Sequence, residues 1–482
     1  MNIDFSLLIP EFMLAGLAFA VLGVDLLAPE HRRNVLSATT AAVGLSAIAA
    51  FTLPYLWNEQ DASLYDGIYR VDQYALLFKA FFLAVGAVSV LMSVEYVGQR
   101  IKHSGEFYGM LVFSVLGAVV MASAGELLTA YIGIELLTFS LYVMVALHRG
   151  DTRSAEASTK YILLGALSSA VLLYGISILY GTLGSTVFTS MEPSLAFGLG
   201  TATILVGFAM LLAGFGFKLA AVPFHLWAPD VYEGAPTPVT ALLSVLSKAA
   251  AFALILRFFA EALPSSIDDW QLTIAVIAAA TMTIGNLTAI AQHNVKRLLA
   301  YSSVGQVGFL MVGLVALTEA ASSALVLHLI GYAFTNLAVF MVLIALENRT
   351  GKEEIVDFAG LGNRAPFSAM VMTASLFSLA GLPIFAGFIT KFYLFTSAAG
   401  EGLLWLVGIA IANSVISLYY YLRIVRQMYV EEPSETSPLR VPVLTTLVLI
   451  ALLAGTVFIG VYPGPIVDII EVANRSLPPF VP

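Results

Sequence analysis

The sequence predicts an all-α polytopic membrane protein with about 14 transmembrane helices. Of its 482 residues, 59% are hydrophobic and 11% are charged, whereas a soluble domain is roughly 45–50% apolar and about 25% charged. Apolar runs of about 20 residues, the length that crosses a bilayer as a helix, recur from Leu7 to Val461. The runs are continuously apolar and do not alternate with polar residues, which excludes a transmembrane β-barrel.

The apolar segments follow one another from the first residues to the end of the chain. The first is a membrane helix rather than a signal peptide, because no basic residue precedes it and Arg32 and Arg33 follow it. The fourth and fifth segments meet at Ala124-Gly125 and therefore form a helical hairpin. The predicted spans are 5–27, 35–56, 73–97, 106–124, 126–147, 158–181, 198–222, 237–262, 270–292, 296–318, 321–346, 367–397, 403–429 and 441–462.

The lysine and arginine residues predict the orientation of these helices, because cations concentrate in cytoplasmic loops. Assigning alternate loops to the cytoplasm places 15 cations there and only two, Arg70 and Arg475, on the opposite side. We therefore expect both termini on the non-cytoplasmic side. The 15 are Arg32, Arg33, Arg100, Lys102, Arg149, Arg153, Lys160, Lys296, Arg297, Arg349, Lys352, Arg364, Arg423, Arg426 and Arg440.

Two segments, the seventh and the twelfth, carry a proline-containing interruption near a lysine. Pro223 follows Lys218, and Pro383 precedes Lys391. Freed backbone groups at membrane depth are tolerated where protein or water satisfies them, so each break predicts a hydrated pocket; a plain proline kink is the alternative. The breaks lie five helices apart, which predicts two inverted five-helix repeats. The predicted units are 1–104, 105–264 (first repeat), 265–430 (second repeat) and 431–482 (last helix and tail).

Charged residues at the centre of a membrane helix indicate function, since each costs roughly 2.5–3.5 kcal/mol even on the lenient insertion scale. Glu135, Lys218, Lys248 and Lys391 are such residues. Static ion pairing is the alternative, but one glutamate cannot neutralise three lysines. A buried lysine gives up its proton readily because burial disfavours the charged form, so lysines coupled to a movable carboxylate predict a proton relay.

Other polar residues in the spans are less informative. His225 and His328 could extend the relay, but a membrane histidine is as often a packing or hydrogen-bonding residue. Glu11, Asp25 and Glu95 lie near helix ends and are expected at the interface. Lys79 and Arg257 also lie near helix ends; snorkelling to the interface is the favoured interpretation for Arg257, and for Lys79 snorkelling and a buried role stay equally open.

The chain resembles the antiporter-like membrane subunits of respiratory complex I, the proton-pumping NADH–quinone oxidoreductase, over its whole length. The most specific motif is FGFKLAAVPFHLWAPDVYEGAPTPV at 215–239, supported by GIEL at 133–136, NVKRLLAYSS at 294–303 and SLAGLPIFAGFITKF at 378–392. DVYEGAP is typical of the subunit N branch, also called subunit 2. Asn336 stands where sister subunits and sodium/proton antiporters carry a lysine, which puts an identical relay in doubt.

The resemblance implies a role for each charged residue. Glu135 would pair with Lys218, Lys248 would connect the two halves, and Lys391 would be the terminal residue. The chain itself would bind no cofactor and no metal, consistent with its lack of cysteine. NADH, FMN, iron–sulfur clusters and quinone would belong to partner subunits, and the 14 helices favour a bacterial plasma membrane. Its partners would be the lipid bilayer and other complex I subunits; the net charge of −9 argues against nucleic acid.

The leading hypothesis is therefore a proton-translocating subunit of a redox pump, coupled to quinone reduction in partner subunits. A component of a multisubunit sodium/proton antiporter is the first alternative, which Asn336 disfavours. A membrane scaffold without a proton path is the second, and it leaves the central lysines unexplained.

Overall fold

The computed structural model of the chain describes residues 4–57, 62–148, 150–195, 198, 200–433 and 437–478, so Arg149 lies outside the described residues. Within these ranges the fold is the predicted helical bundle, and 13 helices are long and apolar enough to span a membrane. The predicted twelfth span is the exception. It is divided at residues 381–385 into two 15-residue helices, each too short to cross a bilayer alone.

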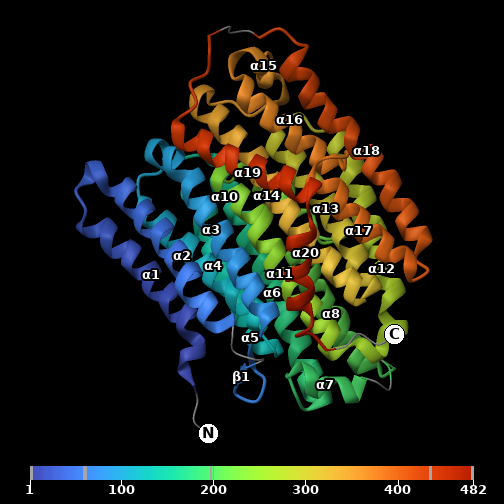
Figure 1. The fold of residues 1–482 in the computed structure, drawn as a ribbon. Coiled ribbons are helices and arrows are strands. Elements are labelled where there is room, and N and C mark those ends of the chain that lie inside the picture. The colour runs from blue at the N-terminus through green and yellow to red at the C-terminus, as the bar shows by residue number, and fades with distance from the viewer. Residues whose placement is uncertain are drawn as a thin grey trace.

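The N-terminal part consists of three long helices and a short hairpin, and its first two helices form one edge of the molecule (Figure 1). The strands pair antiparallel, with Ala62 opposite Val71. The elements are η1 (Phe5–Leu8), α1 (Ile9–Leu27), η2 (Glu30–Arg32), α2 (Arg33–Trp57), β1 (Ala62–Leu64), β2 (Tyr69–Val71) and α3 (Gln73–Arg100).

The next five predicted spans contain the first broken helix. The Ala124-Gly125 turn does join two antiparallel helices, as predicted. The elements are α4 (Ser104–Ser123), α5 (Leu127–Val145), α6 (Thr152–Leu183), α7 (Phe188–Leu195), α8 (Ala202–Leu219), α9 (Trp227–Gly234), α10 (Thr237–Leu242), the π-helical turn η3 (Leu243–Ser247) and α11 (Lys248–Ala262).

The C-terminal part contains the second broken helix and ends on a short helix that packs against α14. Its elements are η4 (Pro264–Ser266), α12 (Ile267–Ile290), α13 (Val295–Ala316), α14 (Glu319–Thr350), η5 (Ile355–Phe358), α15 (Leu361–Arg364), α16 (Pro366–Ala380), α17 (Ala386–Gly400), α18 (Leu404–Tyr429), α19 (Val443–Val461) and α20 (Gly464–Asn474).

Polar side chains fix where several helices begin. Asp72 accepts a hydrogen bond from the Ala75 amide at 2.7 Å and starts α3, and Asn294 does the same for the Arg297 amide at 3.1 Å at the start of α13. Such caps satisfy amides that have no partner inside the helix. At the other end of α14, Gly351 takes the left-handed conformation, with φ of +70°, which ends the helix.

The two helix breaks have the same local geometry. Ala220 and Gly381 are left-handed, with φ of +60° and +87°. The next amide in each case bonds back to a carbonyl five residues earlier, at 2.8 Å from Ala221 and 3.0 Å from Leu382. In both halves the first two helices pack together, α4 with α5 and α12 with α13. These parallels agree with an inverted repeat, which stays a prediction, as do the unit boundaries.

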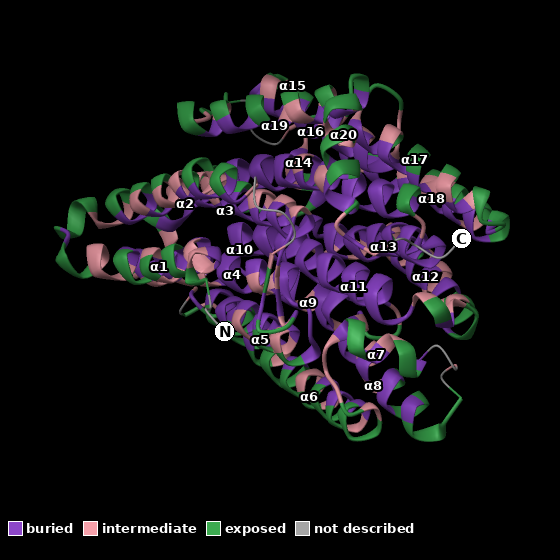
Figure 2. Cartoon of the chain, turned by 60° about the horizontal axis from the view of Figure 1, so that its bottom comes forward, coloured by how far each residue is buried: buried purple, intermediate pink, exposed green. Residues whose placement is uncertain are grey.

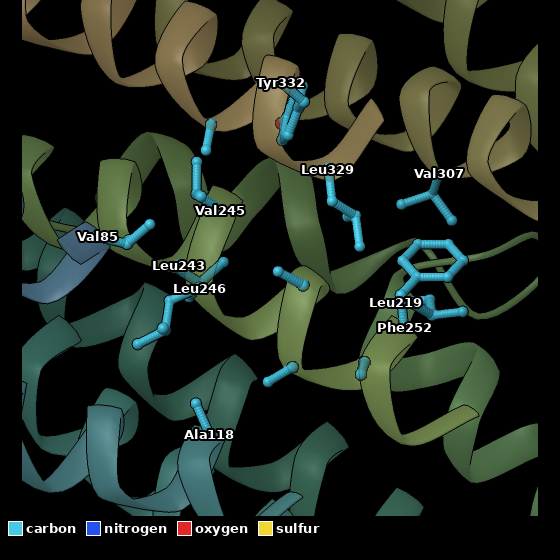
Figure 3. Packing of buried hydrophobic residues seen from close by; sticks show 14 of the residues in the cluster. Val85, Ala118, Leu219, Leu243, Val245, Leu246, Phe252, Val307, Leu329 and Tyr332 are labelled. Atoms are coloured by element: carbon cyan, nitrogen blue, oxygen red, sulfur yellow. The ribbon is translucent and has the colours of Figure 1, made fainter. Parts of the chain in front are cut away.

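The core lies where α10, η3, α11, α13 and α14 meet, and these helices are almost entirely buried (Figure 2). Figure 3 shows apolar side chains of η3, α11, α13 and α14 converging there. The outer helices α1, α2, α6 and α18 instead expose apolar side chains. Polar side chains inside the core are therefore surrounded by other helices rather than by lipid.

Snorkelling is wrong for both Lys79 and Arg257, because both side chains are fully buried. Lys79 Nζ lies 2.7 Å from Glu11 Oε1, which also accepts a hydrogen bond from the Tyr69 hydroxyl at 2.6 Å. Glu11 is therefore a buried partner rather than an interfacial residue, whereas Asp25 and Glu95 are partly exposed, as expected. The β1–β2 hairpin and α1 cover the N-terminal end of α3, so the charged side chains there need partners inside the protein.

Candidate functional site

Glu135 lies on the outer side of the bundle, on α5. Its carboxylate oxygen Oε1 accepts a hydrogen bond from the Ser169 hydroxyl of α6, and the side chain is half-buried. Ile132 and Phe139, on the same helix, are 62% and 60% exposed. Glu135 is therefore an acid at the edge of an apolar lateral surface of the chain.

Lys218 lies in the last turn of α8, directly before the break. Its ammonium group donates to the Thr138 hydroxyl and, at 3.5 Å, to the Ile134 carbonyl, both on α5. Thr138 is one helical turn from Glu135, so the acid and the amine share a stretch of α5. Among the described residues no ion pair joins Glu135 to Lys218; each is instead hydrogen-bonded to a hydroxyl.

Lys248 lies in the fully buried α11, directly after the π-helical turn η3. Its side chain is held by the Ser303 hydroxyl of α13, to which it donates. The Tyr332 hydroxyl of α14 donates to the same serine oxygen at 3.0 Å. The ring of Tyr232 lies beside the ammonium group, with its centroid 5.8 Å from Nζ. Three helices thus converge on this lysine.

Lys391 lies in α17, beside the second break. Its Nζ donates to the Leu379 carbonyl at 2.8 Å and to the Ser414 hydroxyl at 3.1 Å, and it sits 4.5 Å from the Phe309 ring centroid. A mostly apolar cavity of about 440 Å³ between α17 and α18 has Lys391 and Ser414 in its wall. Glu135 and Lys391 therefore lie near two different lateral faces of the bundle.

A second hydrogen-bonded network surrounds Lys391 and begins one turn of α13 beyond Ser303. Gln306 lies one turn after Ser303 on α13; it donates to the Leu379 carbonyl at 3.1 Å, the same carbonyl that Lys391 contacts. The Gln306 oxygen lies 3.3 Å from His328 Nε2. The other ring nitrogen of His328 lies 2.8 Å from the Thr390 hydroxyl. The network lies between α13, α14 and the broken helix.

The comparison with known families covers most of the bundle just described. Residues 124–417 match the family described as NADH:quinone oxidoreductase/Mrp antiporter, TM. A relative from Desulforamulus reducens, NADH-quinone oxidoreductase subunit N, is 44% identical over 476 residues, 99% of each chain. The chain belongs to this family. The resemblance predicted from its motifs is thereby confirmed.

Solved structures agree with this membership of the NADH:quinone oxidoreductase/Mrp antiporter family. A chain of respiratory complex I from Thermus thermophilus with bound aureothin is 29% identical, with a TM-score of 0.80, over 96% of this chain and 100% of that chain. A chain of the Mrp complex from Dietzia sp. is 20% identical, with a TM-score of 0.87, over 99% of this chain and 98% of that chain. At that identity the second likeness shows the fold alone.

Among the described residues, His225 does not contact the lysines of the candidate site. It lies in the connection after the break in the seventh span and is 8% exposed. Its ring nitrogen Nδ1 is buried and has no hydrogen-bond partner among the described residues. No contact between described residues brings His225 to Lys218 or Lys248, so its role stays a prediction, whereas His328 lies inside the network that reaches Lys391.

Sequence reasoning missed the hydroxyl and amide residues of the site, which are Thr138, Ser169, Ser303, Gln306, Thr390 and Ser414. One signal could have found two of them. Ser303 and Gln306 are spaced by three residues in the middle of a predicted span, which places them on one face. The remaining four are single Ser or Thr residues, common in membrane helices because they can bond to their own backbone. Within the described residues no cluster of metal-ligating side chains occurs.

Proposed function

We propose that this chain is a proton-translocating membrane subunit of a proton-pumping NADH–quinone oxidoreductase. Protons would move along Glu135, Lys218, Lys248 and Lys391, coupled to quinone reduction in partner subunits. The observation that carries the proposal is the placement of three buried lysines on α8, α11 and α17, each hydrogen-bonded to a hydroxyl of another helix. Gln306, one turn after Ser303 on α13, donates to the Leu379 carbonyl that Lys391 also contacts.

Two features support a relay rather than static pairs. Glu135 and Lys218 are each bonded to a hydroxyl, so each keeps a hydrogen-bond partner while the two groups are apart. Bringing two charges together at low dielectric changes their energy by several kcal/mol. Moving one charge against a potential of about 100 mV takes about 2.3 kcal/mol, so pairing and separation are sufficient to drive a proton step.

Relatives that match along nearly the full length are NADH-quinone oxidoreductase subunits. In keeping with this, NADH, FMN, iron–sulfur clusters and quinone would belong to the other subunits of the enzyme complex. Sister antiporter-like subunits would cover the lateral faces that carry Glu135 and Lys391. We place the chain in a bacterial plasma membrane, with both termini on the non-cytoplasmic side.

Replacing Lys218 by alanine tests the relay. In inverted membrane vesicles, NADH-driven quinone reduction and vesicle acidification should both fall, on the order of tenfold or more, because a positioned proton carrier is lost. Lys102→Ala, which removes an exposed lysine, is the matched control and should change neither rate. Intact-complex gels establish assembly of both variants.

The outcomes separate the three candidate functions. Normal rates in an assembled Lys218→Ala complex would contradict the relay. If sodium/proton exchange alone were lost, the chain would act as an antiporter component. If no transport changed, it would be a scaffold.

A further inference from the structure

A basic cavity of about 590 Å³ lies at the end of α14 that is predicted to be cytoplasmic. Small-molecule sites typically have volumes of about 300–1,000 Å³. The wall is built from the end of α14, the η5–α15 segment and residues 437–440, which run over the same end of the bundle before α19 begins (Figure 1). The charged side chains among its described lining residues are four cations, Arg349, Lys352, Arg364 and Arg440, and one acid, Asp357.

Hydrogen bonds to the backbone hold the wall of this cavity together. Arg364 Nε donates to the Ser437 carbonyl at 3.2 Å, and the Leu439 amide donates to the Arg364 carbonyl at 2.9 Å. Arg349 Nε donates to the Arg440 carbonyl at 3.0 Å. The segment that precedes α19 is therefore fastened to both α14 and α15, and the cavity between them has a defined shape.

The charges around the cavity favour an anion. Arg349 pairs with Glu95 at 2.6 Å, whereas Lys352 lies 3.9 Å from Asp357 and is 59% exposed. The Arg440 side chain is exposed as well, and none of the ion pairs between described residues includes it. Lysine and arginine form strong, charge-assisted hydrogen bonds with phosphate oxygens. The cavity therefore suits a phosphate group better than a neutral or cationic ligand.

The helix that follows the cavity has an exposed apolar face. α19 begins at Val443, three residues after Arg440, and three residues span at most about 10 Å. The helix packs against α3, α14, α16 and α17, and its outward side chains recur at spacings of three and four residues, which places them in one row. The exposed row consists of Val443, Leu447, Ile450, Ala454, Phe458 and Val461.

We propose that the cavity binds the headgroup phosphate of an anionic phospholipid whose acyl chains lie along the exposed row of α19. Lys352 and Arg440 contact the phosphate, while Arg349 and Arg364 hold the wall. A soluble phosphate could use the same cations, but it would gain nothing from the apolar row beside them. Basic pockets beside membrane helices on the cytoplasmic side bind anionic lipid headgroups in other proteins. This inference does not depend on the proposed proton relay.

The position of the cations distinguishes this cavity from an ordinary basic surface. Cytoplasmic loops of membrane proteins are generally rich in lysine and arginine, so the number of cations alone would indicate no site. Arg32 and Lys102 are also exposed at the end predicted to be cytoplasmic, but neither of them lines the cavity. These two residues therefore provide a control that is matched in charge.

A photoreactive phosphatidylglycerol tests the site in the purified complex, with crosslinked peptides identified by mass spectrometry. Labelling of residues 443–461 should be several-fold higher than with a phosphatidylcholine that carries the same reactive chain, because only phosphatidylglycerol has a net negative charge. Combining Lys352→Gln with Arg440→Gln should reduce this labelling on the order of tenfold. Combining Arg32→Gln with Lys102→Gln removes the same charge and should leave the labelling unchanged. Intact-complex gels establish assembly of both variants.

Three outcomes would overturn the lipid site. Equal labelling by the two lipids would mean that α19 contacts lipid without recognising a headgroup, and this comparison needs no variant to assemble. Equal loss of labelling in both pairs of variants would mean a general attraction of anionic lipid to the basic surface. If inorganic phosphate competes as well as unlabelled phosphatidylglycerol at the same concentration, the cavity binds a soluble anion instead. Each outcome leaves the Lys218→Ala test of the proposed function unaffected.

Discussion

An Arg257→Met chain is expected to be largely missing from assembled complexes. The Arg257 guanidinium is fully buried and contacts both carboxylate oxygens of Asp72, at 2.7 and 2.8 Å, and Glu261 at 3.1 Å. Removing it leaves the buried Asp72 carboxylate without its ion-pair partner, whereas Glu261 keeps Arg70 at 3.4 Å; breaking a buried pair in this way costs about 3–5 kcal/mol. The amount of chain in membranes and the melting temperature of the purified complex measure the loss.

Two further variants identify the cause of that loss. Arg426→Met removes an arginine that pairs with Glu431 at 2.7 Å but is 72% exposed, and an exposed pair contributes about 1 kcal/mol or less, so it should assemble normally. Adding Asp72→Asn and Glu261→Gln to Arg257→Met should restore part of the assembly, because the stranded charges are gone. Wild-type assembly of Arg257→Met alone would show that the Asp72 carboxylate does not need Arg257.

The number and order of the helices could be predicted because every span must be long and apolar enough to cross the lipid bilayer. The sequence could not show that a charge near a helix end is buried. Lys79 and Arg257 lie close to helix ends, and snorkelling would suit both if those ends faced water. The β1–β2 hairpin and α1 cover Lys79 instead, and packing of α11 against α3 encloses Arg257. Burial of this kind depends on contacts between distant segments, which hydropathy does not report.

The charged residues of the site could also be predicted from the sequence, but the residues that they contact could not. Glu135, Lys218, Lys248 and Lys391 each stand out because a charge is costly at membrane depth. Thr138 and Ser303 carry no such cost, since a hydroxyl can bond to its own helix. Only the three-dimensional arrangement of the helices shows which hydroxyls meet an ammonium group.

Loss of pumping without loss of assembly is the expected result of Gln306→Leu. Gln306 joins the Leu379 carbonyl, at 3.1 Å, to His328, at 3.3 Å. Leucine fills much of the same space but can neither donate nor accept, so the network beside Lys391 that includes the Leu379 carbonyl and His328 is interrupted. We expect acidification of inverted vesicles to fall on the order of tenfold or more, with NADH-driven quinone reduction falling alongside it because the two are coupled.

Gln271→Leu separates this effect from a simple loss of stability. Gln271 of α12 also donates its amide to a backbone carbonyl, that of Val315, at 3.1 Å, yet none of its described contacts reaches a relay residue. Each substitution removes an amide–carbonyl hydrogen bond worth about 0.5–1.5 kcal/mol. Gln306→Leu also removes the contact with His328, so it should lose somewhat more thermal stability than Gln271→Leu. If both also lose pumping equally, the network acts only through stability. If Gln306→Leu alone stops acidification, the polar contacts of Gln306 beside Lys391 are needed for proton movement.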